Sequence, residues 1–143
     1  MGTFRDNSRY QGTYRYKNGD IYEGEWLNEL KTGRGRLKLA NGELYEGDFW
    51  EGMKQGTGMY RWGADTYWGQ FAGDKREGLG VYEWGEGASY RGEWQADRMG
   101  GVGRLLKDGL EVVGLFHADQ FVRALEEGEL VQPHVLRFVY PEE

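Results

Sequence analysis

Apolar and polar residues alternate along most of the chain, in short stretches that return at a regular interval. In the stretch Tyr22–Trp26, the two aromatic residues and the glycine between them share one parity, and two glutamates share the other. Gly35, Leu37 and Leu39 alternate with basic residues in the same way. Such strict alternation is typical of a half-buried β-strand. The pattern therefore predicts strands that each have one apolar face and one charged face.

One unit, Tyr-x-Gly-x-Trp/Phe, repeats along the sequence. Its copies begin at Tyr22, Tyr45, Tyr67, Tyr90 and, in degraded form, Val112, so the interval between successive starts is nearly constant. A pair of glycines follows each of the first four tyrosines at the same two offsets: Gly33 and Gly35, Gly56 and Gly58, Gly78 and Gly80, Gly101 and Gly103. Self-similarity at a period of about twenty residues indicates an array of one supersecondary unit.

Asn-Gly dipeptides separate some of the alternating stretches, at Asn18-Gly19 and Asn41-Gly42. Because this dipeptide suits the positive φ values of a tight hairpin turn, each unit is predicted to be a β-hairpin, and successive hairpins join through these turns. The expected fold is all-β: an elongated, single-layer antiparallel meander of repeated hairpins, with about ten strands and with a C-terminal segment packing on the last repeats.

The recurring glycines need a physical reason, because glycine weakens a strand. A ring such as that of Tyr22 or Trp26 can lie flat over a glycine on the neighbouring strand, where no side chain rises. A single sheet has no second layer. Rings laid over glycine are therefore expected to form most of its core.

The opposite face changes character along the array. In the N-terminal half it is charged, and acidic strands face basic ones, which favours cross-strand ion pairs: Glu23, Glu25, Glu46 and Asp48 against Arg34, Arg36 and Lys38. Further on it turns apolar: Trp68, Leu79, Val81, Val102, Leu106, Val113 and Leu115. A solvated face does not stay apolar over several strands, so something is expected to cover it.

The C-terminal segment is the nearest candidate for this cover, and the expected division of the chain is a lead-in at 1–9, the repeat array at 10–116 and a capping or docking segment at 117–143. The segment carries many apolar residues but no glycine pair. Either it folds back over the far face of the last repeats, or it docks on a partner. Within it, 134–140 is predicted to be a strand.

Two local structures compete just after the array. Asp119 could cap a short helix over 120–127. The alternation of Phe-Val-Arg-Ala-Leu over 121–125 favours a last strand instead.

Charge and composition narrow the possible functions. The net charge is −6, and all the acidic excess lies in the second half of the chain. There is no basic block, which disfavours binding to nucleic acid and electrostatic binding to anionic lipid. The absence of cysteine removes disulfides and thiolate zinc sites, and it is typical of a reducing compartment such as the cytoplasm.

No constellation of residues predicts an enzyme. The only histidines, His117 and His134, lack the close spacing of a metal-binding pair, and two ordinary polar histidines are the preferred interpretation. Neither serine, Ser8 or Ser89, stands in a Gly-x-Ser-x-Gly turn. The Gly-x-Gly pairs lack the lysine of a phosphate loop, and the repeat explains them. We therefore expect no catalytic residue, no cofactor and no metal.

The Tyr-x-Gly-x-Trp/Phe units with their glycine pairs resemble MORN repeats over residues 10–116. Val112 departs from the pattern, and 117–143 lies outside it. The resemblance implies an elongated meander that serves as a scaffold, tethers membranes, organises cytoskeletal or ciliary structures, or accompanies an enzyme domain. It also implies that the repeat aromatics are the functional residues: Tyr22, Trp26, Tyr45, Phe49, Tyr67, Phe71, Tyr90 and Trp94.

Trp62 and Trp84 share the face of these rings by parity, so they join the predicted partner-binding set. Tyrosine and tryptophan are favoured interface anchors, and a row of rings can take an extended peptide or a helix. The expected function is a non-enzymatic protein-interaction scaffold, a structural subunit of a larger assembly such as a cilium or axoneme. A membrane tether and a regulatory partner of a separate enzyme are the alternatives. The end strands could also pair two copies.

Overall fold

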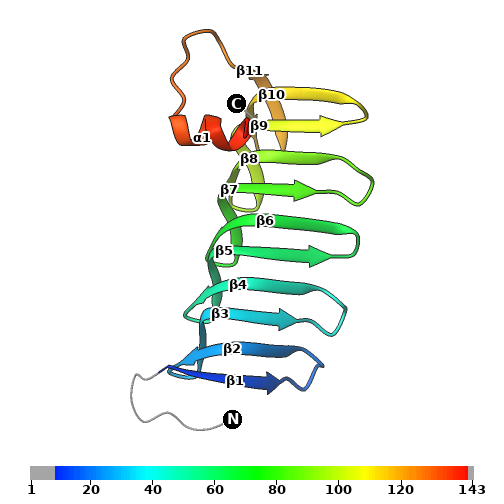
Figure 1. Cartoon of the computed structure of the whole chain (residues 1–143). Coiled ribbons are helices and arrows are strands. Elements are labelled where there is room, and N and C mark those ends of the chain that lie inside the picture. The colour runs from blue at the N-terminus through cyan, green and yellow to red at the C-terminus, as the bar shows by residue number, and fades with distance from the viewer. Residues whose placement is uncertain (1–8, 142–143) are drawn as a thin grey trace.

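A computed structural model describes residues 9–141 as one open sheet of eleven antiparallel strands, in sequential order, followed by one short helix (Figure 1). The strands are β1 Tyr10–Arg15, β2 Ile21–Leu27, β3 Leu30–Lys38, β4 Leu44–Trp50, β5 Met53–Trp62, β6 Asp65–Ala72, β7 Lys75–Glu83, β8 Ser89–Gln95, β9 Arg98–Lys107, β10 Leu110–His117 and β11 Gln120–Ala124. The helix is α1 Pro133–Val139. The predicted single-layer meander of hairpins is confirmed. The predicted lead-in, except for Arg9, lies outside the described residues.

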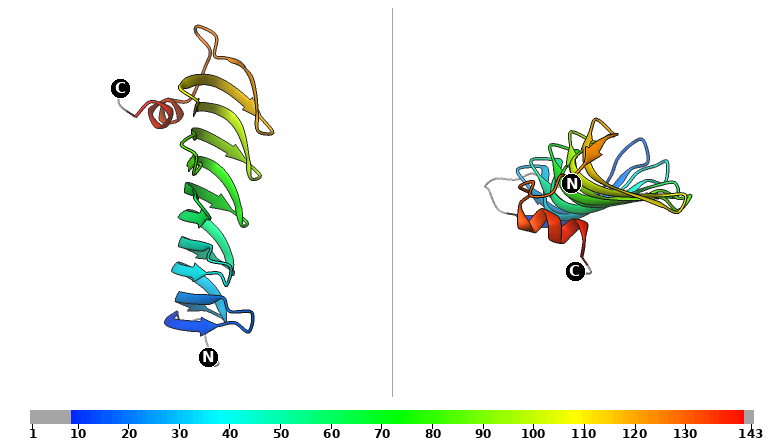
Figure 2. Two further views of the ribbon diagram at one scale, coloured as in Figure 1. Left: turned by 90° about the vertical axis from the view of Figure 1, so that its right-hand side faces the viewer. Right: turned by 90° about the horizontal axis from the view of Figure 1, so that it is seen from above.

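The hairpins stack along a long axis, and their strands lie across it (Figure 2). Seen from above, successive hairpins fan out around that axis, as expected for the intrinsic twist of β-strands. We call the face that carries the motif tyrosines the ring face, and the opposite one the far face. Helix α1 lies against the far face, at the C-terminal end of the array.

The Asn-Gly turns differ from the predicted tight turn. The amide of Tyr16 donates to the carbonyl of Asp20 (2.8 Å), so the loop holds three residues and not two. Within it the Gly19 amide donates to the Tyr16 carbonyl (3.0 Å), and φ is positive at Gly19 but not at Asn18. A three-residue loop of this kind needs a left-handed residue only at its end, which is why the glycine matters there.

Tight two-residue turns occur at the opposite ends of the strands, where the sequence has no Asn-Gly. Asn28 and Glu29 have φ values of 51° and 65°, and Ala96 and Asp97 have 47° and 73°. Neighbouring turns hold one another: the Asp97 amide donates to the carbonyl of Arg76 (3.0 Å), and the Arg76 amide donates to Asp97 Oδ1 (2.8 Å). Contacts between repeats therefore support a backbone conformation that local sequence does not favour.

The two glycines of each pair have different roles. A Cβ atom on Gly35 would overlap the phenol of Tyr22, which confirms the predicted packing of rings over glycine. Gly33 instead forms a β-bulge at φ 59°, and there the amide of Arg34 donates to Glu25 Oε2 (2.9 Å). Glu25 is thus a structural acceptor at the bulge as well as a charged side chain of the far face.

The C-terminal segment folds back on the array, as predicted, but its local structure differs from part of the prediction. Residues 120–124 form strand β11, and Asp119 lies in the preceding turn and caps no helix. Residues 134–140, predicted to be a strand, lie mostly in helix α1. Proline at the start of α1 favours a helix, and its i and i+4 residues Val135 and Val139 are both buried.

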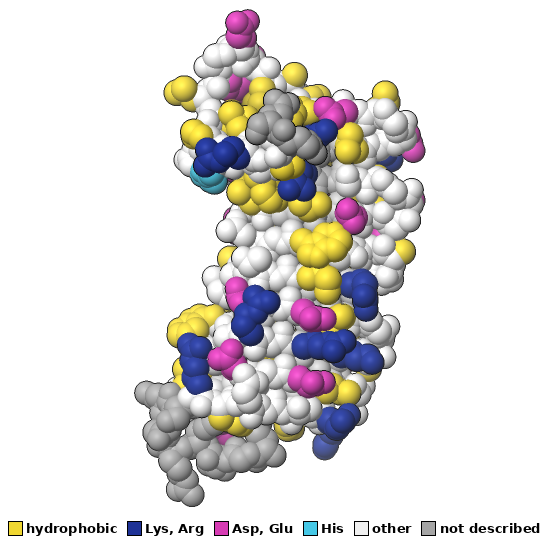
Figure 3. Space-filling model, in the orientation of Figure 1, with side chains coloured by type: hydrophobic (Ala, Val, Ile, Leu, Met, Phe, Trp, Pro, Cys, Tyr) yellow, Lys and Arg dark blue, Asp and Glu magenta, His cyan; other side chains and the backbone are white. Residues whose placement is uncertain are grey.

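Helix α1 covers only a portion of the apolar far face. Val135 and Val139 pack in one cluster with Val102, while Trp68 remains 44% exposed. Figure 3 shows hydrophobic side chains extending from beneath the helix toward the middle of the array, with charged ones beyond them. Among the charged side chains, the expected ion pairs Arg34–Asp48 (2.9 Å) and Arg36–Glu46 (3.6 Å) form.

Within residues 9–141 no helix has the length and apolar character needed to cross a membrane.

Candidate partner-binding groove

The motif rings form the core of the sheet. Each of the eight is exposed by 5% or less: Tyr22, Trp26, Tyr45, Phe49, Tyr67, Phe71, Tyr90 and Trp94. Each motif tyrosine also donates a hydrogen bond from its hydroxyl to a backbone carbonyl three residues ahead, for example Tyr45 to Asp48 (2.8 Å). A partner resting on this face would therefore make most of its contacts with side chains other than these eight.

Edge-to-face contacts link the motif rings from one repeat to the next. Tyr22 meets Phe49 at 5.2 Å between ring centroids, and Tyr45 meets Phe71 at the same distance. Tyr67 meets Trp94 at 5.4 Å. Such pairs stabilise by roughly 0.5–1.5 kcal/mol beyond the area they bury. These contacts fix the spacing of successive repeats, and they thereby position the other side chains of the ring face.

A second set of rings lies beside the motif rings and is partly open to solvent. Trp62 and Trp84, the other two predicted site residues, are both half-buried here. Trp62 packs against Tyr60 (4.8 Å) and Tyr82 (5.4 Å), and Trp84 packs against Tyr82 (4.5 Å). Of the ten predicted residues, these two tryptophans are the most open to solvent.

Three basic side chains form a row on the ring face that the alternating pattern did not single out: Lys31, Lys54 and Arg76. Each stands nine residues after a motif tyrosine, so the repeat register itself carried the signal. The Arg76 guanidinium lies 4.7 Å from the centroid of the Trp94 ring and 5.4 Å from that of Tyr82. Cations over ring faces at these distances are attracted by the ring quadrupole.

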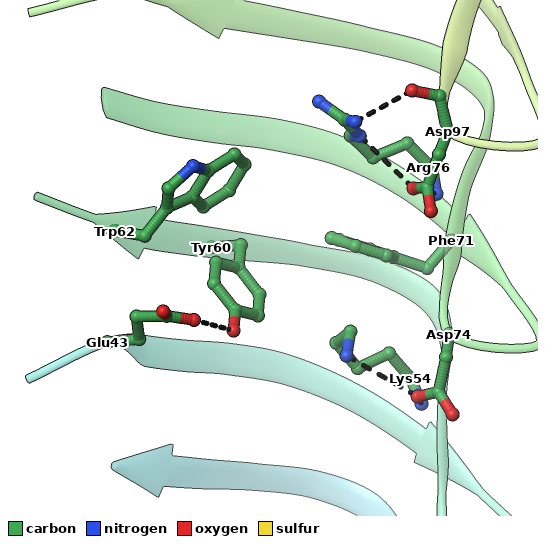
Figure 4. A pocket seen from close by; sticks show the side chains of 8 residues that line it. All are labelled: Glu43, Lys54, Tyr60, Trp62, Phe71, Asp74, Arg76 and Asp97. Atoms are coloured by element: carbon green, nitrogen blue, oxygen red, sulfur yellow. Dashed lines mark hydrogen bonds and ion pairs between the residues drawn. The ribbon is translucent and has the colours of Figure 1, made fainter. Parts of the chain in front are cut away.

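Carboxylates from the next hairpin hold two of these cations in place (Figure 4). Lys54 Nζ lies 3.4 Å from Asp74 Oδ1, and Arg76 Nε lies 3.2 Å from Asp97 Oδ1. The same two oxygens accept the backbone amides of Lys54 and Arg76, each at 2.8 Å. One edge of the ring face is thus a ladder of paired charges.

Acidic residues also line the opposite edge, where they bind phenols. Tyr60 donates to Glu43 Oε1 (2.5 Å), and Tyr82 donates to Asp65 Oδ2 (2.7 Å). Burial, together with the hydrogen bond to the carboxylate, raises the pKa of Tyr60 and of Tyr82 above the ordinary range. Both phenols therefore remain neutral donors at physiological pH.

Two adjoining hollows lie between these edges, and together they make up what we call the aromatic groove. The first has a volume of about 370 Å³ and is lined by Glu43, Lys54, Tyr60, Trp62, Phe71, Asp74, Arg76 and Asp97 (Figure 4). The second shares Trp62, Arg76 and Asp97 with the first and continues past Trp84. Partly exposed rings between charged edges can bind a polypeptide through apolar and ionic contacts together.

Nothing in this arrangement resembles a centre for metal or acid–base chemistry. Over residues 9–141, histidine, aspartate and glutamate side chains form no group of three or more able to hold a metal ion. The carboxylates of the groove are engaged with phenols, cations and backbone amides.

Comparison with known families identifies the repeat. The MORN repeat family matches the chain five times in succession, at residues 11–21, 22–43, 45–66, 67–89 and 90–110. No curated protein matches the chain significantly. MORN repeats are typically non-catalytic and generally take part in protein–protein or membrane interactions. The matches cover well over half of the sequence, and the hairpin array has the same period. The chain therefore belongs to the MORN-repeat family.

Proposed function

We propose that the protein binds a segment of another protein along the aromatic groove. The observation that carries this proposal is the partial exposure of Trp62 and Trp84 between charged edges, on the face that α1 leaves uncovered. Large rings that stay half open to water in the middle of a charged surface are typical interface anchors. The eight buried motif rings support this surface from beneath.

A helix lying along the array suits the groove by its dimensions. One repeat is two strands, which advance the array by roughly 9.6 Å. Seven residues of an α-helix advance by about 10.5 Å. A partner helix would therefore present similar side chains to successive repeats. An extended peptide is the other form of the same proposal, since its side chains alternate along its length.

Substitution of the two partly exposed tryptophans tests the proposal. Capture of partners from a lysate by the wild-type chain, followed by mass spectrometry, defines the bound set. Trp62→Ser combined with Trp84→Ser is expected to reduce capture at least about tenfold, because such anchors contribute on the order of 2 kcal/mol each. Trp68→Ser is the matched control, since Trp68 is exposed on the far face. Undiminished capture by the folded double variant would contradict groove binding.

We place the protein in a larger cytoplasmic assembly, with a cilium or axoneme as the first location to test. The family supports this role in general terms, because its repeats act as interaction scaffolds. Fluorescent tagging of the whole chain tests the location.

Two alternative roles have their own tests. If the set of captured partners contains an enzyme whose activity responds to the protein, the role is regulatory. The net charge of −6 disfavours anionic membranes, and sedimentation with liposomes measures that alternative.

Pairing of two copies through a sheet edge is a further element of the proposal. Strand β11 pairs with β10, and no other described strand lies at its outer side. All five of its residues are exposed, and an unprotected edge is a template for another strand. Light scattering coupled to size exclusion measures the mass. A monomer at high concentration would contradict this pairing.

A further inference from the structure

The row of cations on the ring face is broken at its fourth position. Nine residues after the motif tyrosines stand Lys31, Lys54 and Arg76, but the fourth repeat has Met99. Lys31 Nζ lies 5.7 Å from the centroid of the Tyr22 ring, and Lys54 Nζ lies 5.8 Å from that of Tyr45. Arg76 repeats this placement above Tyr67, at 5.9 Å. Met99 brings no charge to the corresponding place, and it is buried.

The carboxylate that belongs to this fourth position is nevertheless present. Asp119 accepts the amide of Met99 at Oδ1 (2.9 Å) and donates its own amide to the Met99 carbonyl (3.0 Å). Asp97 and Arg76 form the same two backbone bonds, and there Arg76 adds an ion pair. Asp119 forms no ion pair with a basic side chain of residues 9–141. The fourth position thus has the acceptor of the ladder without its cation.

A hollow of about 440 Å³ lies at this position. It is lined by Trp62, Arg76, Tyr82, Trp84, Trp94, Asp97, Met99 and Asp119. Four of these eight residues are aromatic. Asp97 and Asp119 carry two negative charges against the one positive charge of Arg76, so the lining has a formal charge of −1. Because Arg76 is already paired with Asp97, the unbalanced charge belongs to Asp119.

We propose that this hollow binds a cationic side chain, an arginine or a lysine, that a partner segment supplies. The inference rests on the proposed function and specifies one contact of that groove. The incoming cation pairs with Asp119 and lies against the face of Trp84, as Arg76 pairs with Asp97 and lies 5.7 Å from the ring centroid of Trp62, the counterpart of Trp84 in the preceding repeat. Arginine suits the site better than lysine, because a planar guanidinium can stack on a ring and bind a carboxylate at once.

The neighbouring hollow explains why the site is specific to the fourth repeat. There Lys54 and Arg76 both line the cavity, so the protein's own side chains already occupy the cation positions. Its lining also has a formal charge of −1, but Asp74 and Asp97 are paired with these two cations, and Glu43 accepts the hydrogen bond of Tyr60. A further cation would lie beside Lys54 and Arg76 with no carboxylate left for it to pair with. In the hollow beside Met99, by contrast, a cationic side chain of the partner can pair with Asp119.

The test uses N-acetyl-L-arginine amide as the probe and the folded full chain as the receptor. Its binding is followed through the indole N–H signal of Trp84 in a nitrogen–proton correlation spectrum, assigned with Trp84→Phe. A saturable shift of that signal is expected. N-acetyl-L-citrulline amide has the same shape without the charge, and it should give at least about tenfold weaker binding, the typical difference for a charge-assisted hydrogen bond. Equal shifts from both compounds would overturn the proposal.

Variants then locate the charge. Asp119→Asn keeps an oxygen to accept the Met99 amide, so it preserves the turn while removing the charge. It should weaken the arginine probe about tenfold. Asp74→Asn, whose carboxylate already has Lys54 as a partner, is the matched control and should leave the Trp84 shift unchanged. Met99→Arg supplies the missing cation from within and should abolish the shift. A shift retained in Asp119→Asn would overturn the inference.

The outcomes separate this inference from the proposed function. If the groove captures a partner but Trp84 does not respond to the arginine probe, the cation site is wrong and groove binding stands. If the probe binds in an Asp119-dependent way but the Trp62/Trp84 double variant captures partners like the wild type, the cation site stands and groove binding is wrong.

Discussion

Tyr67 and Trp68 are neighbours in the sequence, yet they lie on opposite faces of the sheet and differ strongly in their exposure to solvent. Tyr67 is fully buried on the ring face, while Trp68 is 44% exposed on the far face. At the position of Tyr67 three of the other copies also have tyrosine. At the position of Trp68 the other copies have Glu23, Glu46, Arg91 and Val113. The face that builds the core repeats its residues, and the other face is free to vary.

The variation on the far face follows what covers it. In the first half, Glu46 meets Arg36, and both side chains stay about half exposed. In the fourth repeat Arg91 takes the position of Glu46, and its Nε donates to the carbonyl of Phe138 in α1 (2.6 Å). Its guanidinium also lies 4.8 Å from the centroid of the Phe138 ring. A position that is ion-paired and solvated in one repeat therefore becomes a helix-docking contact in another.

The sharpest test of the buried face is its response to alkaline pH. Burial raises the pKa of Tyr22, Tyr45, Tyr67 and Tyr90 well above the ordinary value of 10.0. Because the folded pKa is higher, this contribution to stability is fully present below pH 10 and is lost as the pH rises through the folded values. Four sites contribute, so this loss should exceed that of any single substitution.

Absorbance of tyrosinate near 295 nm, measured beside circular dichroism, follows this transition. The four motif tyrosines should ionise only together with unfolding. A folded sheet in which all ten tyrosines titrate in one step near pH 10 would contradict the burial of the ring face.

Truncation of Tyr67 is the next largest expected effect. Tyr67→Ala removes a ring that contacts Phe71 at 5.2 Å and Trp94 at 5.4 Å, and it leaves a cavity over Gly80. The free energy of unfolding should fall by about 3–5 kcal/mol, the usual cost of deleting a buried aromatic side chain. Urea denaturation measures it. Trp68→Ala, one residue away, should change the same quantity by about 0.5 kcal/mol or less. Similar losses at the two positions would erase the contrast between the faces.

Detachment of α1 should have a smaller effect confined to the C-terminal end. Val139 is fully buried against the far face, so Val139→Asp would place a charge there and should release the helix. The loss is limited to the docking free energy, about 2–3 kcal/mol. Hydrogen exchange should become faster over 133–139 and stay slow in β3 to β6. Leu136→Asp, at a side chain 38% exposed, is the control and should leave the exchange slow.

The smallest expected effect compares one motif position in two repeats. Arg91→Ala removes the contacts to Phe138, a hydrogen bond and a cation–ring contact. The free energy of unfolding should fall by roughly 1–2 kcal/mol, as is usual when a hydrogen bond from a charged group is lost. Glu46→Ala breaks a solvent-exposed ion pair with Arg36. It should cost less than about 1 kcal/mol. Thermal unfolding of both variants shows which substitution lowers the stability more. A larger loss for Glu46→Ala would contradict the expectation that the far face contributes more stability where α1 covers it.

Prediction from sequence was reliable wherever a pattern repeated. The period of two assigned residues to faces, and the recurring glycines predicted rings packed over glycine, as Tyr22 packs over Gly35. The same patterns could not show how far each ring is buried. Trp26 and Trp62 have the same parity, but Trp26 is in the core and Trp62 is half open. That difference depends on how neighbouring repeats close over each ring.

The cations of the groove show a signal that was present but easily passed over. Lys31, Lys54 and Arg76 recur at a fixed offset, yet a polar residue on a strand near a turn is usually solvated. Their contacts come from the next hairpin: Asp97 lies 21 residues beyond Arg76. The break at Met99 has meaning only once Asp119 is known to complete the same hydrogen-bonded pattern.

The amino-acid pattern alone was enough to specify the meander, the ring face and the family, because alternation and period set which side chains share a face and a one-residue slip would reverse them all. The turns, the helical form of α1 and the accessible length of the groove became visible only in the folded chain. Each of these depends on contacts between distant residues. The 47 residues that separate Arg91 from Phe138 show how distant such contacts are, and local pattern does not encode them.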